Sequence, residues 1–413
     1  MTRQKLRRAL WICDYFPRPF DTTTGTWALE MVAALNRAGL PTIVLSPTPW
    51  IPRPLAVTSK LRAWSQNPPS HDFNGVLAFY PRCPHYPKSW VNNVLYNRLP
   101  FLDSVLLWPW IEGAARRLMA SHPFDVVHAN FLFPSGYLGM RLKQAYGVPL
   151  VVHERSVQRM ALAMENPGRR RLYRQILRAA DLVFTENNRM AAQLRDLEPA
   201  ADVRVVMQPG AEPMHVAGNA VPRPAALAGR KTILSVGTLS ERKGHAFLVR
   251  AMAMVRSQMP DVACRIIGDG PERSKLTRMI EELGLEGTVE LRGKRPHDEV
   301  LQDMSWCDVF ALASWGEAGG TVYGEAMQFG KPVIACQGEG IAEIVLDEVH
   351  GRLVPARDER ALAEAILWLL GDDARRARLG EHARELGEDK LSYPGVARSL
   401  IEMYGALVSQ RPS

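Results

Sequence analysis

The chain has 413 residues, too many for one ordinary hydrophobic core, and this length predicts two or three domains. Hydrophobic residues make up 46% and charged residues 23%, which is typical of a globular enzyme and excludes a disordered or fibrous chain. There is no run of about 18 apolar residues, so we expect no transmembrane helix. Residues 2–8 are basic like the start of a signal peptide, but the apolar stretch after them ends at Asp14 and is too short for one.

Charge is divided unevenly between the two halves. Residues 1–210 hold 26 Lys and Arg against 14 Asp and Glu, whereas residues 211–413 hold 25 against 29. The basic half predicts a contact with an anionic membrane, a phosphorylated acceptor or nucleic acid, and solubility alone explains the charge equally well. The five cysteines are scattered and form no C-x-x-C pair, which disfavours disulfides or a cysteine-bound zinc and favours a reducing, cytoplasmic location.

Short apolar segments typical of strands alternate with amphipathic segments of helix length. In the first half we expect strands at residues 9–13, 42–46, 75–79, 125–128, 149–152, 181–184 and 203–207, and helices at 26–37, 101–120 and 169–179. Residues 50–72 are rich in proline and predict a long loop. In the second half we expect strands at 232–236, 263–267, 288–291, 309–312 and 333–335, and helices at 244–257, 271–283, 298–304 and 321–329.

This alternation predicts βαβ units with parallel sheets, and hence the α/β fold class. We predict two facing doubly wound, Rossmann-like domains at residues 1–210 and 231–390, joined by a linker at 211–230 that is rich in Pro, Gly and Ala. Open α/β sheets bind ligands at the carboxyl ends of their strands, so the ligand is expected in an interdomain cleft.

Two loops of the second half have the chemistry of a phosphate site. After strand 232–236, a loop with Gly237 and Thr238 carries Arg242 and Lys243 at a helix start, where cations and backbone N–H groups neutralise a diphosphate. A solvated turn is the alternative interpretation. Gly268 lies in a Gly-Asp-Gly-Pro turn that would approach the nucleotide or serve as a plain turn.

The second loop, residues 314–327, is the stronger candidate. Gly319 and Gly320 allow the backbone to approach a ligand closely, and the next helix points its amino end at that ligand. Glu317 precedes this helix and Glu325 lies about a turn inside it; each carboxylate can accept two hydrogen bonds from the paired hydroxyls of a ribose or sugar. An exposed helix residue beside a plain turn is the alternative.

Candidate ligand residues of the first half also lie at strand ends. Gly25 opens a helix after the first strand, and His128, Asn130, His153 and Glu154 end two others, where cleft residues are expected. The alternative for each His is that its side chain is buried and has only a structural role. The absence of G-x-G-x-x-G, P-loop, H-E-x-x-H and D-x-D motifs disfavours a dinucleotide, an NTPase, a zinc protease and a metal-held diphosphate.

On these motifs the chain resembles a retaining glycosyltransferase of family 4 with the GT-B architecture, over nearly its whole length. The resemblance is most specific at residues 237–244, 268–271 and 314–345, where Glu317 and Glu325 form an E-x7-E pair. Residues 125–136 are similar to members that build bacterial cell-surface polysaccharides. Residues 391–413 include a segment that resembles the closing helix, which packs back on the amino-terminal domain.

The resemblance implies transfer of a sugar from a nucleotide diphosphate sugar to a glycan or lipid-linked acceptor, with the anomeric configuration of the sugar retained. A UDP-sugar is the favoured donor, and a GDP-sugar is the alternative. We expect no cofactor, and no metal since the D-x-D motif is absent. We expect a location in the cytoplasm from the cysteines, and the basic half allows one at the inner face of the plasma membrane. By the family pattern, Lys243 would bind the donor diphosphate, Glu325 the ribose and Glu317 the donor sugar. The backbone of Gly319 to Thr321 would bind the sugar and phosphate, and the base would lie against the loop of Arg292 and Lys294. Thr238 stands where the family has Arg, and Asn130 replaces the second His of an H-x-H motif, which the family often places near the reacting sugar. The first half would bind the acceptor, with Gly25, Asn130, His153 and Glu154 on the acceptor side and His128 as a catalytic candidate.

Because no second carboxylate can be assigned to the far face of the sugar, we favour front-face attack with stabilisation of the leaving diphosphate by fixed cations and N–H groups. Two alternatives stay open: an epimerase or hydrolase of the same architecture, and a non-catalytic nucleotide-sugar-binding protein. A nucleic-acid partner fits only the basic charge, and we expect none.

Overall fold

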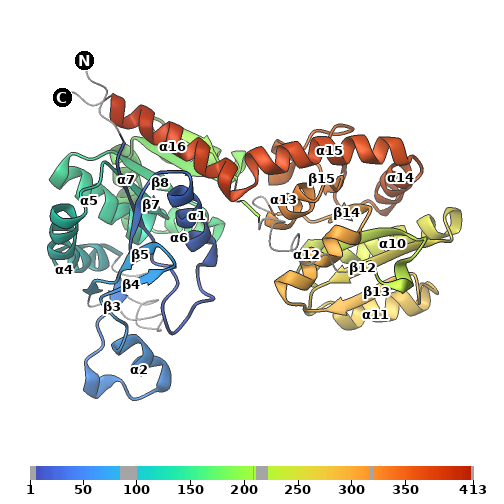
Figure 1. Ribbon diagram of the computed structural model, residues 1–413, viewed down its shortest axis with the longest axis horizontal. Helices are drawn as coiled ribbons and strands as arrows, with labels where there is room; N and C mark the ends of the chain where they lie inside the picture. Colours follow the sequence, from blue (N-terminus) through green and yellow to red (C-terminus); the bar gives the residue numbers. More distant parts are fainter. Residues whose placement is uncertain (1–5, 84–99, 208, 211–221, 317–319, 411–413) are drawn as a thin grey trace. The chain divides into compact units, whose positions relative to one another are not determined.

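The computed structural model describes residues 6–83, 100–207, 209–210, 222–316 and 320–410. The chain folds as two compact units, one made of residues 1–206 and 397–413 and the other of residues 207–396 (Figure 1). Most of the predicted linker, residues 211–221, lies outside the described part. Helix α16 (Tyr393–Ser409) begins in the second unit, and its residues from Ala397 onward belong to the first.

The first unit is built on an eight-stranded sheet in the order β10-β9-β8-β7-β1-β2-β5-β4. Its described neighbours pair in parallel except for β4, which runs antiparallel to β5. The strands are β1 (Ala9–Ile12), β2 (Thr42–Leu45), β4 (Ser70–Phe73), β5 (Val76–Phe79), β7 (Val126–Asn130), β8 (Leu150–His153), β9 (Leu182–Thr185) and β10 (Val203–Val205), with a separate parallel pair β3 (Thr48–Pro49) and β6 (Arg82–Cys83). The helices are α1 (Thr26–Arg37), α2 (Ser59–Ser65), α4 (Pro100–Ser121), α5 (Tyr137–Tyr146), α6 (Val157–Glu165), α7 (Pro167–Ala179) and α8 (Asn188–Leu197).

The second unit has a six-stranded parallel sheet in the order β13-β12-β11-β14-β15-β16. Its strands are β11 (Lys231–Val236), β12 (Val262–Ile267), β13 (Val289–Gly293), β14 (Val309–Ala311), β15 (Val333–Cys336) and β16 (Gly351–Val354). Its helices are α10 (His245–Gln258), α11 (Arg273–Glu282), α12 (His297–Trp306), α13 (Thr321–Gln328), α14 (Glu359–Leu370) and α15 (Asp373–Lys390), and short 3₁₀ turns include η4 (Glu241–Lys243).

Alternation along the strands places helices on both faces of the second sheet. Ile233 and Ile334 pack into one apolar cluster with α10, α11 and α14, whereas their neighbours Leu234 and Val333 pack into another with α12, α13 and α15. Strands buried on both faces appear as continuous apolar runs, which is why the sequence reveals them. The doubly wound, Rossmann-like prediction is therefore confirmed for each unit.

The prediction of one long loop at residues 50–72 is wrong. This stretch contains a 3₁₀ turn (Arg53–Leu55), helix α2 and strand β4. Helix α2 buries no residue, and Thr58 accepts a hydrogen bond from the backbone N–H of Leu61, which closes its first turn. Without an apolar face, such a helix gives no periodic signal in the sequence.

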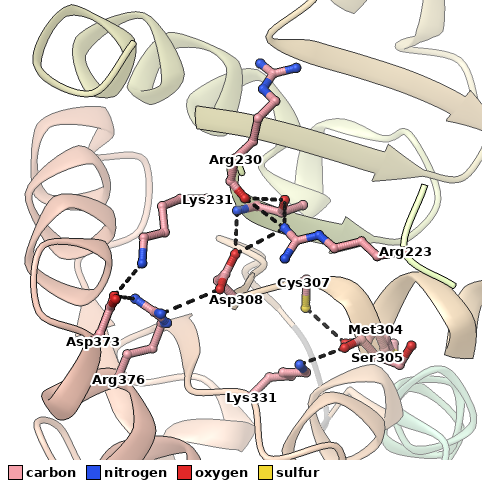
Figure 2. A network of polar contacts seen from close by, with 11 residues as sticks. Arg223, Arg230, Lys231, Met304, Ser305, Cys307, Asp308, Lys331, Asp373 and Arg376 are labelled. Carbon is pink, nitrogen blue, oxygen red and sulfur yellow. Dashed lines mark hydrogen bonds and ion pairs between the residues drawn. The ribbon is translucent and has the colours of Figure 1, made fainter. Parts of the chain in front are cut away.

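A network of ionic contacts fixes the amino ends of the strands in the second unit (Figure 2). Asp308, which precedes β14, accepts a hydrogen bond from the backbone N–H of Thr232 at 2.8 Å. The same carboxylate pairs with Arg223 at 3.5 Å and with Arg376 of α15 at 3.6 Å. Lys231 pairs with Asp373 at the start of α15. In a parallel sheet the amino ends lie opposite the carboxyl ends, so this network stabilises the edge away from the phosphate-type loops.

Candidate functional site

The predicted phosphate loops of the second unit meet at the carboxyl edge of its sheet. The backbone N–H of Gly237, after β11, donates to Ile267 at 3.0 Å, and that of Gly268, after β12, donates to Gly293 at 3.0 Å. Gly268 has φ +148°, and a Cβ there would lie 1.9 Å from the carbonyl oxygen of Gly237. Only glycine permits this approach. The structure therefore brings Gly237, Gly268 and the end of β13 together.

Lys243 lies at the end of η4, and the next residue, Gly244, begins α10 with φ +72°. A Cβ on Gly244 would lie 2.1 Å from the carbonyl oxygen of Ala313, so this turn rests directly on the chain after β14. The Lys243 side chain is half-buried, and its Cδ and Cε lie 3.4 and 3.6 Å from the position of a Cβ on Gly237. The stem of Lys243 thus runs along the Gly237 backbone, which keeps its ammonium group at the strand edge.

Arg242 lies in the predicted loop, before α10, and makes two contacts with the loop after β14. Its carbonyl oxygen accepts a hydrogen bond from the backbone N–H of Trp315 at 3.0 Å, and its Nη1 donates to the carbonyl oxygen of Gly316 at 2.8 Å. These two bonds tie the loop after β11 to the loop after β14. We therefore assign Arg242 to positioning these loops, while Thr238 beside it is exposed.

Helix α13 points its amino end toward the same edge. Gly320 precedes it with φ +70°, and buried Tyr323 anchors its first turn by donating to the carbonyl oxygen of Leu312. Thr321 is the first helical residue. Free N–H groups and the helix dipole make such an end suitable for an anion. Glu317 and Gly319, the other predicted residues of this loop, lie outside the described residues.

Glu325 is almost buried within α13, with 7% of its side chain exposed. Gly210 packs against it so closely that a Cβ on Gly210 would lie 2.7 Å from Glu325 Cγ. His297 at the start of α12 brings its Nε2 to 3.6 Å from Glu325 Oε1. The carboxylate is therefore fixed in place, as a group that receives two sugar hydroxyls needs to be.

The side chain of Arg292 is engaged inside the protein. Its guanidinium lies 3.3 Å from Asp303 and 3.3 Å from Glu290, in a cluster that also contains Arg265. Burial raises the pKa of Asp303 despite these cations. The Arg292 side chain is therefore not available for the predicted contact with a base, and the groups of this loop that remain for it are its backbone and the exposed Lys294.

His245 is a residue of this edge that the sequence analysis missed. It is 1% exposed, and its Nδ1 lies 3.3 Å from Ser235 Oγ. Burial, with the Lys243 charge as a second cause, lowers the pKa of His245 to about 4, so the ring is neutral near pH 7. Its position directly after Lys-Gly at the helix start was the available signal.

His128 lies inside the first unit, with no exposed surface. Its ring stacks on Trp11 with centroids 3.9 Å apart, and its Nδ1 lies 2.6 Å from the hydroxyl of Tyr404 in α16. Burial lowers the pKa of His128 to about 3 and holds the pKa of neighbouring His153 well below its usual value. This placement argues against the reacting role predicted for His128, because a fully covered ring cannot reach a substrate without rearrangement. Asn130 is likewise fully buried and donates weakly to the Ile12 carbonyl at 3.4 Å.

Glu154 is also fully buried, and it shapes the loops after β7 and β8. Its carboxylate accepts hydrogen bonds from the backbone N–H groups of Leu132, Arg155 and Ser156 at 2.8 to 3.0 Å. Burial raises the pKa of the Glu154 carboxyl although these donors oppose the rise. The predicted acceptor contact of Glu154 is thus replaced by a structural role. Gly25, with φ +77°, starts α1 against the carbonyl oxygen of Tyr15, where a Cβ would lie at 1.9 Å.

Charged side chains at the carboxyl edge of the first sheet were not singled out from the sequence. Arg155 pairs with Glu186 at 2.8 Å and covers the ring of Trp27 at 4.2 Å. Arg159 pairs with Asp14 at 3.2 Å. These residues follow different strands and helices, so only the fold reveals that they share one edge. Their side chains are largely buried, with 9% of Arg155 and 19% of Arg159 exposed, and they give this edge its charged groups.

Two absences complete the description. Within the described residues, no group of three or more His, Cys, Asp and Glu side chains is arranged to hold a metal ion. No helix in the described part of the chain is long and apolar enough to cross a membrane. All five cysteines are buried.

Comparison with known proteins connects both units to sugar transfer. Residues 22–211 match the family model "Glycosyl transferase 4-like domain", and residues 221–386 match "Glycosyl transferases group 1". The chain is 29% identical over 307 residues to the D-inositol 3-phosphate glycosyltransferase of Corynebacterium glutamicum, covering 69% of this chain and 73% of that protein. It is 31% identical over 242 residues to a putative colanic acid biosynthesis glycosyltransferase of Escherichia coli, covering 57% and 59%.

A solved structure from Anabaena, HepE in complex with UDP, is similar in fold. It matches 97% of this chain and 100% of its own with a TM-score of 0.64, at 19% identity. Two sugar-transfer family models on the two halves, and a fold shared over the full length, lead to one conclusion: the chain is a glycosyltransferase with the GT-B fold, composed of a glycosyl transferase 4-like domain and a glycosyl transferases group 1 domain.

Proposed function

We propose that this protein is a retaining, metal-independent glycosyltransferase of family 4, which uses a UDP-sugar in preference to a GDP-sugar. The observation that carries the proposal is the convergence of Lys243, the amino end of α13 and the fixed Glu325 carboxylate at one sheet edge. A cation, a helix amino end and a buried carboxylate are complementary to the diphosphate and ribose of a nucleotide sugar.

In the proposed reaction the acceptor hydroxyl oxygen forms a bond to the anomeric carbon while the bond from that carbon to the β-phosphate oxygen breaks. The hydroxyl proton passes to the departing phosphate, which lies on the same face and so leads to retention. Lys243 and the N–H groups at the start of α13 stabilise the charge that grows on the leaving diphosphate. Arg242 holds the two loops that carry these groups, and neutral His245 adds no second positive charge beside Lys243.

The acceptor is proposed to be a glycan or lipid-linked intermediate of bacterial polysaccharide synthesis. The E. coli relative is named for colanic acid synthesis, and this chain matches just over half of it. The charged edge formed by Arg155 and Arg159 supports a polar acceptor in the first unit. A location in the cytoplasm stays a prediction from the cysteines, and one at the inner face of the plasma membrane stays a prediction from the basic first half.

The test is a reaction of purified protein with UDP- and GDP-hexoses in the presence of a chelator, with candidate acceptors. We expect UDP release, and a product whose new linkage has the donor's anomeric configuration by NMR. Conversion of one nucleotide sugar to another without UDP release would indicate an epimerase. Binding of nucleotide without any turnover would indicate a non-catalytic protein, and loss of activity with chelator would contradict metal independence.

A further inference from the structure

A groove lined by arginines lies between α5 and α7 of the first unit, on a surface to which no role has been given. The two helices pack side by side in Figure 1. The groove has a volume of about 870 Å³. It is lined by Tyr137, Met140, Arg141, Gln144, Gly168, Arg171, Leu172, Gln175, Arg178 and Ala179, and an adjoining hollow adds Pro167, Arg170 and Arg174.

The charge of this surface is strongly one-sided. Helices α5 and α7 contain seven Lys and Arg residues and no Asp or Glu. Glu198 pairs with Arg178 at 2.6 Å and with Arg174 at 3.5 Å. Arg170 and Arg171 are exposed and, among the described residues, form no ion pair. The apolar face of α7 packs into the core through Tyr173. Arg169 is buried with it, whereas the other four arginines of α7, Arg170, Arg171, Arg174 and Arg178, are exposed.

Several of these guanidinium groups are held in position. Arg141 lies over the ring of Trp108 at 5.1 Å and makes a hydrogen bond with Tyr137. Glu198, with 5% of its side chain exposed, holds Arg174 and Arg178. All the cations that line the groove are arginines, whose planar fork binds carboxylates and phosphates in a bidentate manner. The side chains that would contact an anion are therefore partly pre-organised.

The other lining residues indicate what kind of anion fits. Gln144 and Gln175 offer amide donors and acceptors, and Tyr137 offers an aromatic face with a hydroxyl group. Because α7 has 13 residues, the groove extends for about 20 Å along it. A concave groove that mixes arginine, amide and aromatic groups matches a chain of acidic sugars better than it matches the plane of a bilayer.

We propose that the α5–α7 groove is a binding site for an acidic glycan, a sugar chain that bears carboxylate or phosphate groups, separate from the donor site. The inference rests on the proposed function and extends it, since it identifies the class of glycan that the enzyme binds and holds during synthesis. Binding at the groove requires no donor, so it can be measured independently of sugar transfer.

The experiment is isothermal titration of the full chain with an oligomer of six α-1,4-linked galacturonic acids, at low and high salt. The oligomer of six α-1,4-linked glucoses serves as the uncharged match. Arg170→Gln with Arg171→Gln removes two unpaired cations from the groove. Arg37→Gln with Arg360→Gln removes the same charge from exposed positions on α1 and α14 and is the matched control.

We expect the acidic oligomer to bind, with affinity falling as salt rises, and the glucose oligomer not to bind. The groove variant should weaken binding about tenfold or more, while the control pair changes it little. Arg141→Gln is a second variant with the same expectation, and an unchanged melting temperature ensures that each variant is folded.

Three results would overturn the proposal. In the first, the acidic oligomer fails to bind at low salt, and in the second, the groove and control variants lose oligomer binding equally. In the third, the groove variant loses binding to phosphatidylglycerol vesicles but keeps its binding of the oligomer. The last result would identify the groove as a membrane surface. Failure of sugar transfer alone would refute the proposed function and leave the groove binding intact.

Discussion

Replacing Lys243 with alanine tests the proposed donor site at its most important charge. The variant removes the ammonium group and the stem that lies along Gly237, while the backbone turn is kept by Gly244 and its contact with Ala313. We therefore expect the fold to persist and the rate of transfer to fall.

The size of the effect follows from the position of the side chain. Two unit charges about 4 Å apart near a protein surface interact by about 4 kcal/mol. Since Lys243 is half-buried, solvent screens part of this interaction, and about 2–3 kcal/mol remains for the transition state. As 1.4 kcal/mol corresponds to a factor of ten, kcat/KM should fall about 100-fold.

The assay is steady-state release of nucleoside diphosphate, with melting temperature measured alongside. Lys275→Ala is the control, because Lys275 is an exposed lysine of the same unit that pairs only with Glu272 in the described part of the chain. Its kcat/KM should match that of the unmodified protein. A Lys243→Ala protein with near-native kcat/KM, or an equal loss in both variants, would refute the reasoning.

Three further predictions concern the same unit and the buried histidines. Glu325→Gln should raise the donor KM about tenfold with little change in kcat, because a charged hydrogen bond to the ribose is lost; an unchanged KM would exclude Glu325 from the donor site. Asp308→Asn should cost about 1–3 kcal/mol of stability by calorimetry and leave the donor KM unchanged, since Asp308 lies at the opposite sheet edge; a raised KM would contradict this. Burial lowers the pKa values of His128 to about 3 and His245 to about 4. As pH falls from about 6.5 toward 4, these histidines are therefore protonated in the unfolded chain but stay neutral in the folded protein, which lowers the free energy of unfolding. The melting temperature should therefore decrease over that window, and a flat profile would disprove neutral burial.

The parallel sheets were predictable because their strands are buried on both faces. Strands β12 (VACRII) and β15 (VIAC) appear in the sequence as short, mainly apolar runs, and Gly268 follows β12 directly at the strand-to-helix turn. Gly268 illustrates why the site was partly predictable: a glycine directly after a strand indicates a close backbone approach, and the structure supplies its partner, Gly237. Helix α2 could not be found in this way, since it has no buried face.

Side-chain partners were the part that the sequence could not provide. From the sequence, Arg242 and Arg292 both resemble phosphate or base ligands in a loop. In the structure Arg242 donates a hydrogen bond to the Gly316 carbonyl, and Arg292 forms an ion pair with Asp303. The sequence places His128 at the end of a strand, but β7 continues to Asn130, and Tyr404 of α16, 276 positions further along the chain, contacts the His128 ring. Such contacts join segments distant in sequence, and no local pattern encodes them.

The most direct test of the donor site is a crystal structure of the protein with a bound UDP-sugar. We expect the diphosphate beside Lys243 and the first turn of α13, with the ribose hydroxyls bound to Glu325. A diphosphate bound away from Lys243 and α13, or held through a metal ion, would contradict it.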